Sequence, residues 1–136
     1  MVALTSDRNT PARSGDIREF PVAAGAVIYA GALVALNASG YAVPAATATT
    51  LKVVGRAEQA VDNTGGAAGA VTAKVGAGIY RFGNSTSTDA IADTDIGADC
   101  YAVDDQTVAK TSGSSTRSVA GKVFDVDALG VWVKFS

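Results

Sequence analysis

Residues 70–82 read Ala-Val-Thr-Ala-Lys-Val-Gly-Ala-Gly-Ile-Tyr-Arg-Phe. In the first half of this stretch, small apolar residues alternate with Thr72 and Lys74, which is the period of a half-buried β-strand. After a Gly-Ala-Gly step, a second alternating segment places Tyr80 and Phe82 on one face and their neighbours on the other. The stretch therefore predicts two consecutive strands.

Short apolar segments of this kind recur along the chain and are cut by Gly, Asn, Asp, Ser and Thr. None of them shows a convincing helical period. Several short strands at regular spacing indicate an all-β fold, either a sandwich or a barrel. The other strands that we expect span residues 17–22, 26–29, 32–36, 41–43, 51–61, 100–103, 107–109, 118–126 and 130–135.

Residues 1–16 are rich in turn and coil formers, and we expect them to form an extended N-terminal arm. Arg8, Arg13 and Arg18 are spread along the arm and its root. The arm is interpreted either as a frayed terminus or as a segment that orders against a partner. Residues 17–136 are expected to form a single β-sandwich domain, in which Pro21 marks the first strand as an edge strand.

A faint internal repeat suggests that the two halves of the chain supply matching strands, although chance similarity in an Ala-, Gly- and Val-rich chain is the alternative. Three pairs of similar segments occur in the same order: residues 31–37 and 97–104, residues 53–57 and 119–123, and residues 70–75 and 130–135.

The composition offers few of the side chains that catalysis at neutral pH requires. The 136 residues contain no His and one Cys, Cys100, which therefore has no His to activate it as a nucleophile. We expect no enzymatic activity, no cofactor and no small-molecule substrate. The net charge is −2 and the basic residues form no run or stripe, so a nucleic-acid partner is not expected either.

Two further features raise the questions of a metal and of a membrane. The acidic loop with Asp89, Asp93, Asp95 and Asp99 has a spacing that Ca²⁺ tolerates, but it lacks the distal Glu of an EF-hand. We interpret these residues as solvated loop acids rather than as a metal site.

Residues 21–51 carry no charge. Their unbroken apolar part is shorter than the roughly 20 residues of a spanning helix, so we expect buried strands and no membrane partner.

Six segments follow one another in a characteristic order. They are the uncharged Gly-containing stretch 22–44, Lys-Val-Val-Gly-Arg-Ala at 52–57, the Gly-rich loop before 70–75, Ile-Gly-Ala-Asp-Cys-Tyr at 96–101, Val-Ala-Gly-Lys-Val at 119–123 and Val-Trp-Val-Lys-Phe at 131–135. In this order and composition the chain resembles the small capsid decoration, or cement, proteins of tailed bacteriophages. The resemblance covers about residues 17–135 and rests on compositional motifs.

The resemblance implies a jelly-roll-like β-sandwich that binds the outer surface of an icosahedral shell of HK97-type major capsid proteins. Such proteins bridge neighbouring capsomers against the internal pressure of DNA, and they often act as dimers or trimers. It therefore implies a protein made in the host cytoplasm and located in the virion, on the outside of the capsid. The family has no catalytic residues to transfer to this chain.

Two other classes stay open: another virion module from a tail or fibre, and a carbohydrate-binding β-sandwich. For the leading hypothesis we expect a homodimer on the capsid, with part of residues 21–51 near a subunit interface. The candidate partner-binding residues are cations of the arm and aromatic residues near it: Arg8, Arg13, Arg18, Phe20, Tyr29 and Tyr41.

Overall fold

The computed structural model describes residues 2–135, so Met1 of the expected arm and Ser136 of the expected domain lie outside the described residues. The described chain is built from strands and two short 3-10 turns, η1 (Ser87–Asp89) and η2 (Asp93–Asp95), which confirms the all-β class. The strands are β1 (Ile17–Pro21), β2 (Val27–Ile28), β3 (Leu33–Leu36), β4 (Ala42–Pro44), β5 (Lys52–Ala57), β6 (Val61–Asp62), β7 (Thr72–Gly76), β8 (Ile79–Asn84), β9 (Asp99–Ala102), β10 (Thr107–Ala109), β11 (Val119–Asp127) and β12 (Gly130–Lys134).

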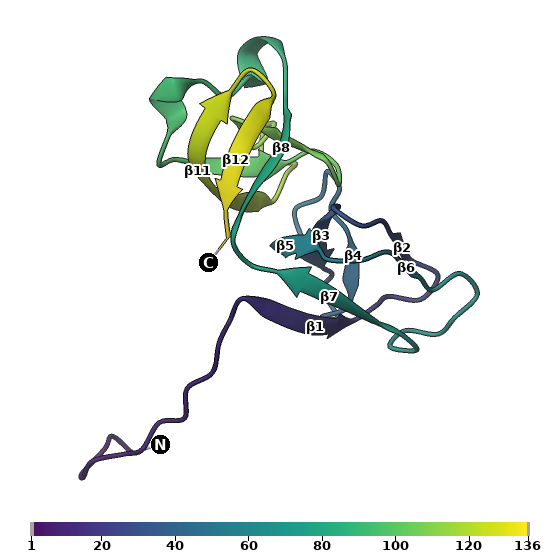
Figure 1. Cartoon of the computed structure of the whole chain (residues 1–136), viewed down its shortest axis with the longest axis vertical. Helices are drawn as coiled ribbons and strands as arrows, with labels where there is room; N and C mark the ends of the chain where they lie inside the picture. Colours follow the sequence, from purple (N-terminus) through teal and green to yellow (C-terminus); the bar gives the residue numbers. More distant parts are fainter. Residues whose placement is uncertain (1, 136) are drawn as a thin grey trace.

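The strands divide between the two halves of the chain (Figure 1). The first half forms an open five-stranded sheet in the order β1-β7-β5-β3-β4, with the short pair β2-β6 beside it. The second half forms a closed barrel in the order β10-β8-β12-β11-β9. This division does not confirm a jelly roll, whose strands form two facing sheets. It does confirm β1 as an edge strand, as Pro21 predicts.

The two halves are the same five-stranded unit. Their strands match in chain order as β1 with β8, β3 with β9, β4 with β10, β5 with β11 and β7 with β12, and this matching reproduces both sheet orders. The registers agree as well: Val34 pairs with Gly55, and 66 positions later Cys100 pairs with Gly121. In both halves the register shifts immediately beside this pair, at a β-bulge. The internal repeat expected for these segments is therefore confirmed.

The last pair of segments in the expected repeat is offset by two residues. Arg56 pairs with Gly76 in the first half, whereas the matching Lys122 pairs with Lys134. Gly76 therefore corresponds to Lys134, and not to the position after Phe135 as the similarity of the sequences suggested. A shift of two residues keeps every side chain on its face of the sheet, so the apolar pattern does not reveal it.

One residue explains why only the second unit closes. In the barrel, the N–H of Gly83 donates to the carbonyl of Gln106 over 2.8 Å and joins β8 to β10. The residue of β1 that corresponds to Gly83 is Pro21, which has no N–H to donate. The first unit keeps a single bridge at this place, between Val22 and Ala42, and its sheet stays open.

Each unit has its own apolar interior, and the two interiors differ in what covers them. Val22, Ile28 and Val34 are fully buried within the first unit. The interior of the barrel also takes in Leu33 and Ala35, which project from the other face of the first unit's sheet and are fully buried there. The open sheet thus contributes to the core of the barrel, and this shared cluster holds the halves together.

The segment before β1 stands apart from this body. Residues 2–16 are exposed and belong to no strand, and Figure 1 shows them running away from the sheets. The last of these residues, Asp16, is fixed to β7, because its carbonyl accepts a hydrogen bond of 2.8 Å from the N–H of Ala77. The residues before it have little of the described chain to pack against.

Candidate partner-binding surface

The root of the arm and β1 bring three of the expected residues together. The guanidinium carbon of Arg18 lies 4.9 Å from the centroid of the Phe20 ring, a distance at which the cation is attracted to the ring face. Arg13 lines the same shallow hollow beside β1. Phe20 is half-buried because its ring packs on the interior of the first unit. This part of the surface therefore combines two cations with an anchored aromatic residue.

The other expected residues lie elsewhere. Arg8 is exposed farther along the arm. Tyr29 follows β2 and is 67% exposed, beside a shallow hollow that also includes Asp105 and Gln106 of the barrel. Tyr41 is half-buried in the β3–β4 hairpin. The structure does not gather the six residues into one site, and they remain predictions for a partner surface.

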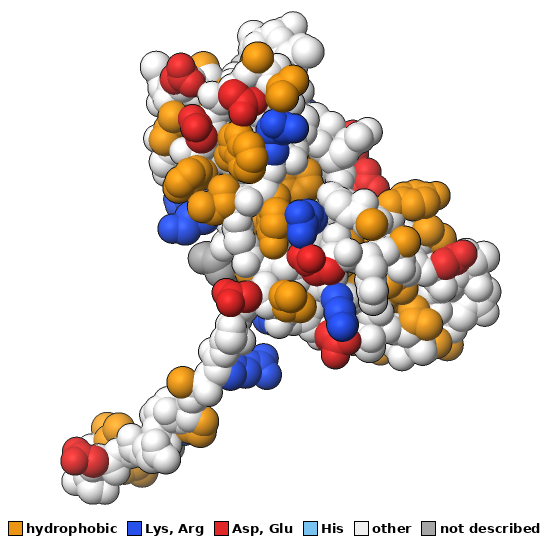
Figure 2. Space-filling view, in the orientation of Figure 1, with side chains coloured by type: hydrophobic (Ala, Val, Ile, Leu, Met, Phe, Trp, Pro, Cys, Tyr) orange, Lys and Arg blue, Asp and Glu red, His pale blue; other side chains and the backbone are white. Residues whose placement is uncertain are grey.

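Exposed apolar side chains that the sequence did not single out lie on the barrel. Phe124 is 53% exposed and sits where β11 forms a second β-bulge against β12. Leu129, at the turn between these strands, is 74% exposed. Figure 2 shows separate groups of apolar side chains over both halves on the face in view. The bulge interrupts the alternation in β11, so periodicity gave no signal for the exposure of Phe124.

Trp132 is held in place on the outside of the barrel. Its indole N–H donates to Asp127 over 2.8 Å, and the Arg81 guanidinium lies 5.5 Å from its ring centroid. The bonds from Trp132 and from the backbone N–H groups of Leu129 and Gly130 lower the pKa of Asp127.

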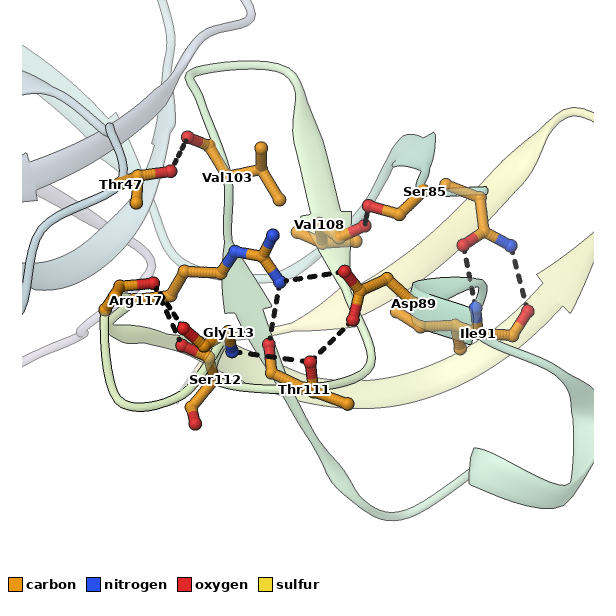
Figure 3. Close-up of polar contacts among 12 residues, drawn as sticks. Thr47, Ser85, Asp89, Ile91, Val103, Val108, Thr111, Ser112, Gly113 and Arg117 are labelled. Atoms are coloured by element: carbon orange, nitrogen blue, oxygen red, sulfur yellow. Dashed lines mark hydrogen bonds and ion pairs between the residues drawn. The ribbon is translucent and has the colours of Figure 1, made fainter. Parts of the chain in front are cut away.

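The loops at one end of the barrel are fixed by a polar cluster (Figure 3). Asp89 accepts a bond of 2.5 Å from the Thr111 hydroxyl and an ion pair of 3.3 Å from Arg117. Arg117 also donates to the carbonyl of Thr111 over 3.1 Å. The bond from Thr111 is the main reason that the pKa of Asp89 lies below its usual range. The cluster holds the loop after β8 to the loop after β10.

A second clamp fixes the same loop from the inside. The side-chain amide of Asn84 accepts from the N–H of Ile91 and donates to its carbonyl, both over 2.9 Å (Figure 3). Ile91 is buried in the interior of the barrel, so its backbone has no water to bind. A further bond of 2.8 Å, from the Thr47 hydroxyl to the carbonyl of Val103, ties the first half to the barrel.

The acidic side chains that follow β8 are divided among separate local contacts. Asp95 accepts the N–H of Ala92 over 2.8 Å, and Asp99 forms an ion pair of 2.6 Å with Lys122. With Asp89 engaged by Thr111 and Arg117, three of the four loop acids serve a local contact. Within residues 2–135 there is no group of three or more acidic, His or Cys side chains that suits a metal ion.

Cys100 is fully buried in the barrel, near the carbonyl of Gly121. Burial raises the pKa of its thiol to about 11, so the thiol stays protonated at neutral pH. Among the described residues, no helix has the length and apolar character needed to cross a membrane. No family model, no curated protein and no solved structure matches this chain.

Proposed function

We propose that this chain is a structural decoration protein that binds the outer surface of an icosahedral phage shell and stabilises contacts between HK97-type major capsid proteins. It acts there as a homodimer, in the virion, after synthesis in the host cytoplasm. The proposal starts from the family that the sequence resembles. The chemistry of the described residues fits it, because the polar groups are used to fix loops and strands.

The observation that carries the proposal is the exposed arm. Residues 2–16 are exposed, and they carry Arg8 and Arg13 together with Val2, which is 91% exposed, and Leu4, which is 72% exposed. A segment with both cations and apolar side chains gains order when it finds a surface with acidic and apolar groups. We therefore expect the capsid surface that this segment meets to carry acidic and apolar groups.

The body suits the same role. A clamp between neighbouring capsomers has to keep its shape under load, and the two units share an apolar cluster that includes Leu33 and Ala35. The proposal includes the jelly-roll-like sandwich of the family. In it, the open sheet and the barrel, which pack on this cluster, correspond to the two layers of the sandwich.

The test is co-sedimentation of the purified chain with shells assembled from the major capsid protein of the source phage and lacking any decoration protein. The proposal expects saturable binding at a fixed ratio to the capsid subunits. Shells of an unrelated HK97-type phage serve as the control. Sedimentation no greater than with the unrelated shells would reject the proposal.

A further inference from the structure

Strand β1 leaves one backbone edge open. The carbonyl of Asp16 accepts from Ala77, and the N–H of Val22 donates to Val71, so the even-numbered residues of β1 are the ones that face β7. In an antiparallel ladder the residues between them point their N–H and C=O groups to the other side. Ile17 and Glu19 therefore present two donors and two acceptors away from the sheet.

Two of the devices that protect such edges, a β-bulge and a covering strand, are missing from the described residues here, and the protection that remains is the charge of Arg18 and Glu19 and the proline at the end of the strand. Ile17 is 57% exposed and Glu19 is exposed as well. The strand carries no bulge against β7, and in the described part of the chain no strand pairs with β1 on its outer side at Ile17–Phe20. The residues before β1, including Gly15, are exposed and belong to no strand, so they can lengthen β1 once the bend at Asp16 straightens.

We propose that this edge pairs, antiparallel, with the same edge of a second copy of the chain, about a two-fold axis at Ile17. The inference deepens the homodimer of the proposed function and rests on that part of it alone. Ile17 then lies opposite Ile17 of the partner subunit. Asp16 lies opposite Arg18 of the partner subunit, and the symmetry repeats this ion pair on the other side of the axis.

The charges of the strand select this register. The outward-pointing backbone groups allow symmetric pairings that differ by one residue in the position of the axis. An axis at Arg18 sets two arginines opposite each other, an axis at Glu19 sets two glutamates, and an axis at Asp16 sets two aspartates. Like charges directly opposite destabilise a strand pair. With the axis at Ile17 none of these like-charge contacts forms, and Asp16 and Arg18 instead form two symmetric acid–base pairs.

The matching strand of the barrel, β8, lacks the charged residues that flank Ile17 in β1. Ile79 of β8 corresponds to Ile17 and is 39% exposed. Its neighbours, Gly78 and Tyr80, give no acid–base pair across a two-fold axis. We therefore expect the self-pairing to be confined to β1, with β8 as the internal control.

Sedimentation velocity over a series of protein concentrations tests the inference. The wild type is expected to dimerise reversibly. Asp16→Arg and Arg18→Asp, each alone, turn both ion pairs into repulsions and are expected to raise the dissociation constant by about tenfold or more. The double variant restores both pairs with opposite sign, and is expected to dimerise within about threefold of the wild type. Circular dichroism checks that each variant folds.

A cross-link gives a second, independent measurement. Hydrogen-bonded antiparallel partners have Cα atoms about 5.5 Å apart, which suits a disulfide. Ile17→Cys is expected to form a disulfide-linked dimer under mild oxidation, whereas Ile79→Cys is not, and the native Cys100 is buried. Monomeric wild type at every concentration, single reversals without effect, a double variant that stays monomeric, or equal cross-linking of both cysteine variants would each overturn the inference.

These outcomes are separate from those of the shell-binding test. A dimer with this register that fails to bind shells would uphold the β1 pairing and reject the capsid role. A monomer that binds shells at a fixed ratio would reject the β1 pairing and uphold the capsid role.

Discussion

Gly55 and Gly121 occupy the same place in the two repeated units. Each lies beside a β-bulge in one of two matching strands, β5 or β11, and each pairs with a buried residue, Val34 or Cys100. A Cβ atom at Gly55 would overlap the carbonyl oxygen of Gly76, and one at Gly121 would lie 2.6 Å from that of Lys134. The close approach of backbones at this crossing is therefore a property of the unit itself.

Substitution of either glycine by alanine is expected to destabilise the protein. The added methyl group has to displace backbone, and Gly55 also has a φ of 149°, which other residues rarely adopt. We expect Gly55→Ala and Gly121→Ala each to lower the free energy of unfolding by about 1–3 kcal/mol in urea denaturation. Gly15→Ala, where a Cβ meets nothing within 4 Å, is the matched control. Unchanged midpoints for both variants would contradict the described crossing.

The repeat also predicts an asymmetric pair of substitutions, at Leu33 and its counterpart Asp99. Leu33 is fully buried in the cluster shared with the barrel, so Leu33→Asp places an unpaired charge there and is expected to cost about 3–5 kcal/mol, if the protein folds at all. Asp99→Leu removes an exposed ion pair with Lys122 and is expected to cost about 1 kcal/mol or less. Equal effects on the unfolding midpoint would show that the halves do not share this core.

Acid is expected to weaken the barrel through Asp127. Its pKa is lower in the folded protein than the ordinary 3.8, so the carboxylate stabilises the fold above that pH. This contribution is lost as the pH falls below 3.8 and through the folded value. Asp127→Asn removes this titrating group. The melting temperature of the variant should therefore fall less steeply than that of the wild type when the pH is lowered from neutral into acid. Asp7→Asn in the arm is the control, and a slope equal to that of the wild type would rule out this role.

The sequence predicted much of the local structure. The alternation in residues 70–82 placed β7 and β8 correctly, and the strands expected at 100–103 and 107–109 correspond to β9 and β10. These signals are local, because a strand in a half-covered sheet has to alternate. The matching strands β1 and β8 share the pattern Ile-Arg-Glu-Phe and Ile-Tyr-Arg-Phe, but four residues are too short a match to identify a repeat from the sequence alone.

The closure of the sheets depended on a contact that no local pattern reveals. At the place where the barrel closes, the two units differ by one hydrogen bond, which Gly83 donates and Pro21 cannot. Pro21 indicates an edge strand in the sequence, but its correspondence with Gly83 follows only from the strand registers. The scatter of Arg8, Tyr29 and Tyr41 over the surface has the same cause, since burial and pairing are long-range properties.

The arm makes a prediction that does not depend on the β1 pairing. Deletion of residues 2–12 leaves β1 and its root intact, so the protein should fold and dimerise as before. It removes the exposed Arg8 and the apolar side chains near it, and binding to shells should weaken by about three- to tenfold. Arg8→Gln should flatten the salt dependence of binding, with Asp7→Asn as the control. Full occupancy of shells by the deleted form would mark the arm as a frayed terminus.

Electron cryo-microscopy of the source particle tests the capsid role most directly. The capsid role predicts density for both five-stranded units on the outer surface of the shell, in contact with at least two neighbouring major capsid proteins, with residues 2–12 ordered against those proteins. A bare outer surface, or density for this chain in the tail or its fibres, would contradict it.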